Sequence, residues 1–153
     1  MEFLAMNTMN IYTIGFTKKN AETFFGLLNK AGVRTLIDVR LNNISQLAGF
    51  AKRDDLKFFL KEICQVDYVH APDLAPTEDM LKSFKKGELS WAGYEKKFLS
   101  LMSNRRVEDL LSENQLENSC LLCSEHDPRF CHRRLVAEYL NKKLNFRINI
   151  KHL

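Results

Sequence analysis

The chain has 153 residues, of which 45% are hydrophobic and 27% charged, and its formal net charge is +4. This composition excludes a disordered or collagen-like chain, and the length is typical of one globular domain, here residues 1–153. The sequence contains no run of about 18 apolar residues and no secretory signal, so we expect a cytoplasmic protein without a membrane contact, whose four cysteines are reduced thiols.

The first half of the chain predicts strands alternating with helices. The expected strands are short and rich in β-branched and aromatic residues; they are residues 10–15, 33–39 and 66–70. Between the first two, Asn20 can cap a helix that Gly32 stops. A second helix is predicted around residues 56–63.

The second half begins with a predicted helical insert at about residues 77–116. Its expected helices are residues 77–86, a helix capped by Ser90, and residues 107–116. A buried strand at 119–124 follows, and Pro128 stands where a proline favours the first turn of a helix. Residues 146–150 are expected to form the last strand.

Strands that alternate with helices indicate an α/β protein. We expect a three-layer fold: a mostly parallel sheet, helices on both faces, and the helical insert before the fourth strand. In such folds the site lies beyond the carboxyl ends of the strands. The predicted strand ends are polar, so these groups should gather at one edge of the sheet.

The segment richest in reactive side chains runs from Cys123 to Arg134. Strand alternation puts Cys123 and Glu125 on one face of the sheet and Cys120 on the other. Cys131 and His132 are expected in the first turn of the next helix, with Arg133 or Arg134 facing the loop. A helix N-terminus with arginines beside it is a natural binding site for an anion.

Four short motifs occur in order along the chain. They are Thr13-Ile14-Gly15, Asp38-Val39-Arg40, Leu122-Cys123-Ser124-Glu125 and Cys131-His132-Arg133. With Tyr68 and Tyr94, they resemble the domain of unknown function 488 family over nearly the whole chain. The resemblance implies an α/β fold and a shared site, but no established reaction.

A thiolate nucleophile is one interpretation of this site. Nearby arginines and a helix N-terminus would lower the pKa of Cys123. The acids Glu125 and Asp127 should raise it, and buried strand cysteines are usually inert. We therefore expect Cys123 to be buried and slow to react.

A metal site is a second interpretation, because cysteine and histidine suit zinc. Cys120 and Cys123, however, should point to opposite faces of their strand. Cys123, Glu125, Cys131 and His132 form an easier set. From the strand pair we expect no bound zinc, no other metal and no cofactor.

Carboxylate chemistry is a third interpretation, with Asp38 and Glu125 as an acid/base pair near Arg40. The alternative is an ion-pair network that holds the loops. A fourth interpretation is a non-catalytic module that binds nucleic acid or another protein. Residues 126–153 contain seven arginines and lysines but two acids, although no nucleic-acid-binding motif is present.

Taken together, the sequence favours a small anionic or phosphate-bearing ligand, bound at the carboxyl edge of the sheet and hydrolysed there. The ligand-binding residues that we expect are Thr17, Arg40, Cys131, His132 and Arg133. The expected catalytic residues are Asp38, Cys123 and Glu125. The helical insert could form a lid or a homodimer surface.

Overall fold

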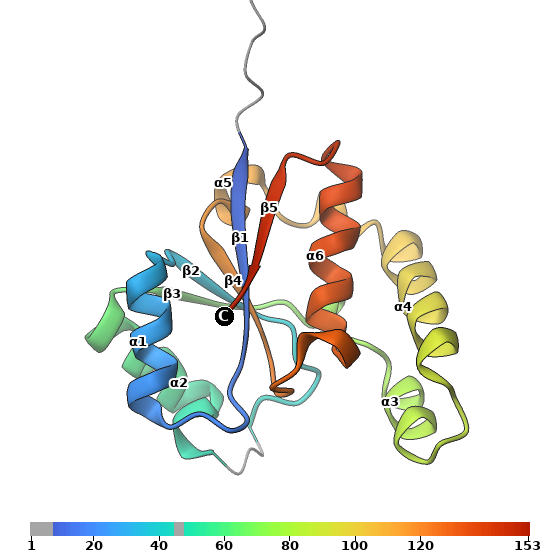
Figure 1. Ribbon diagram of the computed structural model, residues 1–153, viewed down its shortest axis with the longest axis horizontal. Coiled ribbons are helices and arrows are strands. Elements are labelled where there is room, and N and C mark those ends of the chain that lie inside the picture. Colours follow the sequence, from blue (N-terminus) through green and yellow to red (C-terminus); the bar gives the residue numbers. More distant parts are fainter. Residues whose placement is uncertain (1–7, 45–47) are drawn as a thin grey trace, which may run out of the picture.

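A computed structural model describes residues 8–44 and 48–153 and shows a five-stranded, all-parallel sheet (Figure 1). The strands are β1 (Met9–Gly15), β2 (Thr35–Asp38), β3 (Asp67–His70), β4 (Ser119–Cys123) and β5 (Ile148–His152). Their order is β3-β2-β4-β1-β5, so β4 lies at the centre of the sheet. The parallel sheet confirms the predicted fold class. The N-terminal stretch examined for a secretory signal lies outside the described residues.

Helices cover both faces of the sheet, which makes three layers (Figure 1). One face packs against α1 (Ala21–Ala31) and α2 (Arg53–Phe59), which continues as a π-helical turn, Leu60–Cys64. The other face packs against α6 (His132–Lys143), and the insert helices pack in the same core. These are α3 (Glu78–Lys85), α4 (Trp91–Arg105) and the short α5 (Glu113–Leu116).

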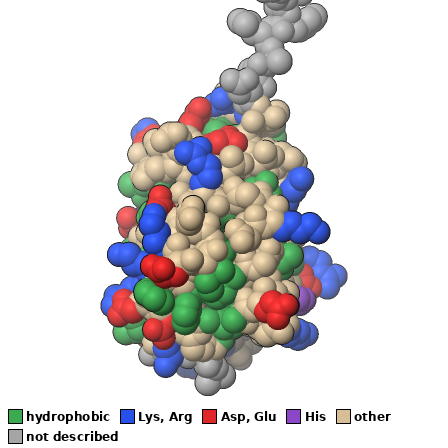
Figure 2. Space-filling model, turned by 90° about the vertical axis from the view of Figure 1, so that its left-hand side faces the viewer, with side chains coloured by type: hydrophobic (Ala, Val, Ile, Leu, Met, Phe, Trp, Pro, Cys, Tyr) green, Lys and Arg blue, Asp and Glu red, His purple; other side chains and the backbone are tan. Residues whose placement is uncertain are grey.

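The α1 and α2 layer has an outer face on which hydrophobic side chains gather among charged ones (Figure 2). Phe58 and Ile63 belong to this layer, and both are exposed. No helix in the described parts of the chain is long and apolar enough to cross a membrane.

The helix boundaries follow the capping residues that the sequence provides. The Asn20 side chain accepts a hydrogen bond from the backbone N–H of Thr23, 2.8 Å away, and Gly32 ends α1 with φ at 72°. Thr77 and Ser90 accept equivalent bonds at the starts of α3 and α4. These side chains satisfy backbone donors that a helix N-terminus leaves free.

The prediction of one continuous helix over residues 107–116 is wrong. The chain instead forms a 3-10 turn, Val107–Asp109, and the short helix α5. Arg106 ends α4 in the left-handed region, with φ at 50°. Ser112 and Gln115 then form a reciprocal capping box that starts α5 anew.

The helix predicted to open at Pro128 begins later. Pro128–Phe130 forms a separate 3-10 turn, and Cys131 is extended, with φ at −135° and ψ at 138°. Cys131 is therefore the N-cap residue of α6 instead of a member of its first turn. The last strand also begins two residues later than predicted, because Asn145 and Phe146 both have positive φ.

Candidate functional site

A cavity of about 920 Å³ opens at the carboxyl edge of the sheet. The segments that follow β2 and β4 form part of its wall, and α3, α4 and the start of α6 form the rest. Its lining residues are Arg40, Leu41, Asn42, Pro76, Glu78, Leu81, Lys82, Phe84, Lys85, Trp91, Tyr94, Cys123, Ser124, Glu125, Phe130, Cys131 and His132. A cavity here agrees with the general rule for parallel α/β sheets.

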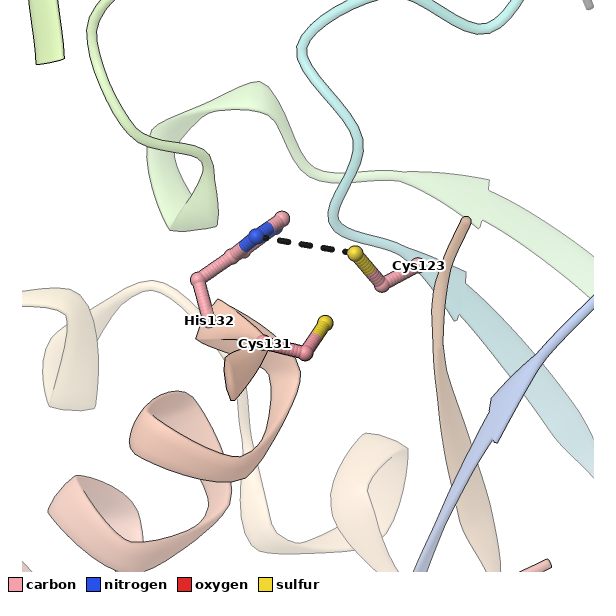
Figure 3. A group of neighbouring side chains, drawn as sticks. All are labelled: Cys123, Cys131 and His132. Atoms are coloured by element: carbon pink, nitrogen blue, oxygen red, sulfur yellow. Dashed lines mark hydrogen bonds between the residues drawn. The ribbon is translucent and has the colours of Figure 1, made fainter. Parts of the chain in front are cut away.

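Two thiols and one imidazole converge on this cavity (Figure 3). One ligand atom each of Cys123, Cys131 and His132 lies within 4.8 Å of the other two, and all three residues are buried. The Cys123 Sγ lies 3.6 Å from the His132 Nδ1. Cys123 comes from the end of β4, whereas the other two come from the start of α6. The extended backbone of Cys131 thus lies between the strand and the helix.

The imidazole of His132 is held in one orientation. Its Nε2 lies 2.7 Å from the Val39 carbonyl oxygen, which can only accept a hydrogen bond. The proton is therefore on Nε2, and the Nδ1 faces the Cys123 sulfur. The Phe98 ring packs against the imidazole at a centroid distance of 5.7 Å.

The three side chains perturb one another. The hydrogen bond with Cys131, together with His132, holds the pKa of Cys123 well below its ordinary value although burial opposes this. Burial and the Cys123 sulfur raise the pKa of Cys131. Burial lowers the pKa of His132, but the Cys123 sulfur outweighs it and the net shift is upward. The expectation that neighbouring acids raise the pKa of Cys123 is therefore wrong, since the Glu125 side chain is exposed and its backbone hydrogen bond lowers that pKa.

Arg133 is buried beneath the loop that follows β4, with 1% of its surface exposed. Its guanidinium donates to the Thr13 hydroxyl at 3.2 Å, to the Glu125 carbonyl, and to the His126 carbonyl at 3.2 Å. Another contact reaches the Cys131 Sγ at 3.9 Å. This geometry does not support the expected ligand-binding role, because the donors hold the loop and the residue does not line the cavity.

Asp38 and Arg40 form a bidentate ion pair, with both N–O distances at 2.8 Å. The Tyr68 hydroxyl also donates to Asp38 at 2.5 Å, and burial followed by this bond raises the pKa of Tyr68. Asp38 is fully buried and already has these partners. The geometry therefore favours the ion-pair network over an acid/base role for Asp38.

Arg40 also reaches the cavity. It is 3% exposed, and its second terminal nitrogen (Nη1) is buried with no hydrogen-bond partner among the described residues. Its guanidinium carbon lies 5.5 Å from the centre of the Phe16 ring. Arg40 thus lines the cavity and has a terminal nitrogen whose N–H groups are unpaired among the described residues.

Glu125 and Thr17 occupy different places at the rim. Glu125 is exposed and lines the cavity beside the thiols. Thr17 does not line it; its hydroxyl donates to the Ser124 carbonyl at 2.5 Å. Thr17 therefore fixes the loop after β4, while Glu125 is available to a ligand.

Sequence reasoning missed the aromatic and basic wall that the insert provides. Trp91 stacks on Tyr94 with ring centres 5.0 Å apart, and Phe130 meets Trp91 edge-on at 5.6 Å. Lys82 and Lys85 stand beside these rings at the cavity. The sequence placed Tyr94 with the family motifs, but no local signal revealed that α4 would face the end of β4.

The face of α6 that carries Tyr139 packs in the core. The Tyr139 side chain is 8% exposed, and its hydroxyl donates to Glu108 at 2.7 Å. Leu135 and Val136 pack in the same core, so Tyr139 is not an exposed ring on which a base could stack.

Comparison with known families matches residues 20–140 to the family described as Domain of unknown function DUF488. The chain belongs to this family. The match confirms the resemblance that the motifs indicated. No curated protein and no solved structure matched the chain.

Proposed function

We propose that this DUF488 protein binds a small anionic, phosphate-bearing ligand in the cavity at the carboxyl edge of its sheet. The observation that carries the proposal is the buried Nη1 of Arg40, which has no hydrogen-bond partner among the described residues although Arg40 lines the cavity. A buried donor left unpaired costs about 1–3 kcal/mol, and an anionic oxygen would remove that cost while forming a charge-assisted bond.

The basic side chains of the insert add to this attraction. Lys82 pairs with Glu78 at 3.2 Å, but Lys85 has no ion pair among the described residues. Lys85 is exposed at the cavity wall, so it can reach a ligand that enters from solvent. The ligand would then lie between Arg40 on the inside and Lys85 at the mouth.

Hydrolysis of the bound ligand is the activity that we propose for the site. Glu125 is the general base, because its carboxylate lines the cavity and makes no ion pair with any described residue. The oxygen of a water molecule attacks the phosphorus atom and forms a new P–O bond, while one proton of that water passes to Glu125. The ester P–O bond breaks, the leaving oxygen takes up a proton from solvent, and Glu125 returns its proton to solvent.

Calorimetric titration with phenyl phosphate and inorganic phosphate tests the binding step. Lys85→Gln should weaken the affinity by about 3- to 10-fold, because an exposed charge contributes modestly. Lys143→Gln, on the far end of α6, is the matched control and should bind as the parent does. Equal affinity of the parent, Lys85→Gln and Arg40→Lys for these ligands would contradict the proposal.

The hydrolysis step has a separate test. Release of phenol from phenyl phosphate should fall by about 100-fold or more in Glu125→Gln, whereas the affinity for inorganic phosphate should stay within about threefold of the parent. Unchanged hydrolysis in Glu125→Gln would remove this residue from the mechanism and leave the binding proposal intact.

A further inference from the structure

The anion-binding proposal leaves the most unusual cluster of the cavity without a role. Cys123, Cys131 and His132 bring two thiols and an imidazole together in a buried position (Figure 3). The proposed phosphate contacts use none of these groups, and apolar packing does not explain why a polar imidazole is buried beside two thiols. Their chemistry is that of ligands for a soft or borderline metal ion.

We propose that Cys123, Cys131 and His132 form a binding site for a divalent metal ion of the zinc class, with its fourth coordination position open to the cavity. The sequence alone favoured no metal, since Cys120 and Cys123 should point apart. The structure agrees with that separation, because Cys120 packs on the α1 and α2 side. The residues that lie beside Cys123 are instead Cys131 and His132, at the start of α6.

The spacing of the donor atoms fits one tetrahedral ion. Zn–S and Zn–N bonds of about 2.3 Å and 2.1 Å at a tetrahedral angle place sulfur and nitrogen about 3.6 Å apart. The Cys123 Sγ and His132 Nδ1 are 3.6 Å apart, and all three donor atoms lie within 4.8 Å. Small side-chain rotations would therefore bring the third donor to the same ion.

The surroundings of His132 prepare its Nδ1 for a metal. Histidine ligands commonly donate their other ring N–H to a carbonyl or carboxylate, which fixes the tautomer and the ring orientation. The bond from Nε2 to the Val39 carbonyl, 2.7 Å long, has this form. It leaves the Nδ1 lone pair directed at the sulfur cluster.

Arg133 supplies a positive charge next to the sulfurs. Its Nη1 lies 3.9 Å from the Cys131 Sγ and also donates to the Glu125 carbonyl, while its Nη2 donates to the His126 carbonyl in the β4–α6 loop. A hydrogen bond to a ligating sulfur stabilises the thiolate that a metal requires. Two thiolates and a neutral imidazole would also neutralise a divalent ion within the buried site.

The site has three protein ligands and an accessible side. Among the described residues, Cys123, Cys131 and His132 are the possible metal ligands in this cluster, and all three line the cavity. Structural zinc sites are usually closed by four protein ligands, whereas catalytic sites keep one position for water or substrate. The open position would face the ligand that Arg40 and Lys85 attract, although the metal proposal stands independently of that ligand.

Metal content of the whole chain is the first test. Protein purified without chelators from zinc-supplemented medium should contain about one zinc per chain by elemental mass spectrometry. His132→Ala and Cys131→Ser should each lose at least about 80% of it, while Cys64→Ser and Cys120→Ser, the matched controls, should retain it. Equal zinc in all four variants, or a folded parent without zinc that also fails to bind added Zn²⁺, would overturn the proposal.

Two further measurements keep the test valid if a variant fails to fold. Replacement of zinc by Co²⁺ in the parent should give a sulfur-to-cobalt charge-transfer band in the near ultraviolet. Zinc should also slow the alkylation of Cys123 and Cys131 by iodoacetamide at least tenfold relative to chelator-treated protein, with Cys64 unaffected. A Cys123–Cys131 disulfide in zinc-supplemented protein, or alkylation that zinc does not change, would contradict the proposal. Phosphate binding measured on the same samples separates this result from the anion proposal.

Discussion

The His132 Nε2 lies 2.7 Å from the Val39 carbonyl oxygen, and this hydrogen bond joins the start of α6 to the end of β2. The two residues are separated by 93 positions in the chain. The bond brings Asp38-Val39-Arg40, at the end of β2, and Cys131-His132-Arg133, at the start of α6, to the same edge of the sheet. Because β4 is the neighbour of β2 in the sheet, Cys123 at the end of β4 lies at this edge too, 3.6 Å from the His132 Nδ1.

His132→Ala should lower the free energy of unfolding by about 2–4 kcal/mol, since it removes a buried ring and leaves the Val39 carbonyl without this donor. Urea denaturation of metal-free protein measures the change without a contribution from bound ions. His126→Ala is the control on an exposed residue and should change stability by less than about 1 kcal/mol. Equal effects of both variants would contradict a structural role for the His132 bond.

Arg133→Ala should destabilise the protein by at least about 3 kcal/mol. The substitution leaves the buried Thr13 hydroxyl and the partly buried Glu125 and His126 carbonyls without this donor. The adjacent Arg134 is a matched control, because its ion pair with Glu138 is at the surface. Arg134→Ala should cost about 1 kcal/mol or less, as measured by the midpoint of thermal and urea unfolding.

The arrangement of the fold was largely predictable from the sequence. Five short apolar strands separated by capped helices indicate a parallel α/β sheet, and residues such as Asn20 and Gly32 mark the ends of α1. The boundary near Pro128 was less predictable, because a proline suits the first turn of an α-helix and of a 3-10 turn equally well. The extended Cys131 separates this 3-10 turn from α6, and nothing in the local sequence marks that break.

The members of the candidate site were more predictable than their roles. Strand alternation predicted that Cys123 and Cys120 lie on opposite faces of the sheet. The core contacts agree, because Leu121 packs in the α6 core whereas Cys120 packs on the α1 and α2 side. The role of Arg133 could not be read locally, because its partner Thr13 lies 120 positions away in β1. The contribution of Trp91 also depends on how α4 packs on α6, which no short motif encodes.

Gly15→Ala should prevent stable folding or lower stability by more than about 3 kcal/mol. A Cβ on Gly15 would lie 1.7 Å from the Glu125 carbonyl oxygen and 2.7 Å from the Arg133 guanidinium. The control Gly26→Ala, in α1, meets nothing within 4 Å and should be neutral or stabilising by up to about 1 kcal/mol. Circular dichroism and urea unfolding of both variants give the comparison, and a folded Gly15→Ala with parental stability would be inconsistent with this packing.

His152 provides a test of pH dependence away from the thiol cluster. Its Nδ1 lies 2.6 Å from the Thr13 hydroxyl. Burial, followed by the positive charge of Arg133, lowers its pKa; Arg134 acts in the same direction and Glu138 opposes them. Titration of the His152 ring protons by NMR should therefore give a pKa below the ordinary value of about 6.5.

The sign of the effect on stability follows from this direction. His152 binds a proton more tightly in the unfolded chain than in the folded one. The contribution of neutral His152 to the free energy of unfolding is therefore fully present above the unfolded pKa. It is lost as the pH falls through the lower, folded pKa. The stability advantage of the parent over His152→Asn should thus shrink between pH 8 and pH 5, by less than about 1 kcal/mol because solvent screens an exposed ring. Urea unfolding of both proteins across this range measures the difference, and an advantage that grows on acidification would show that His152 gains a proton on folding.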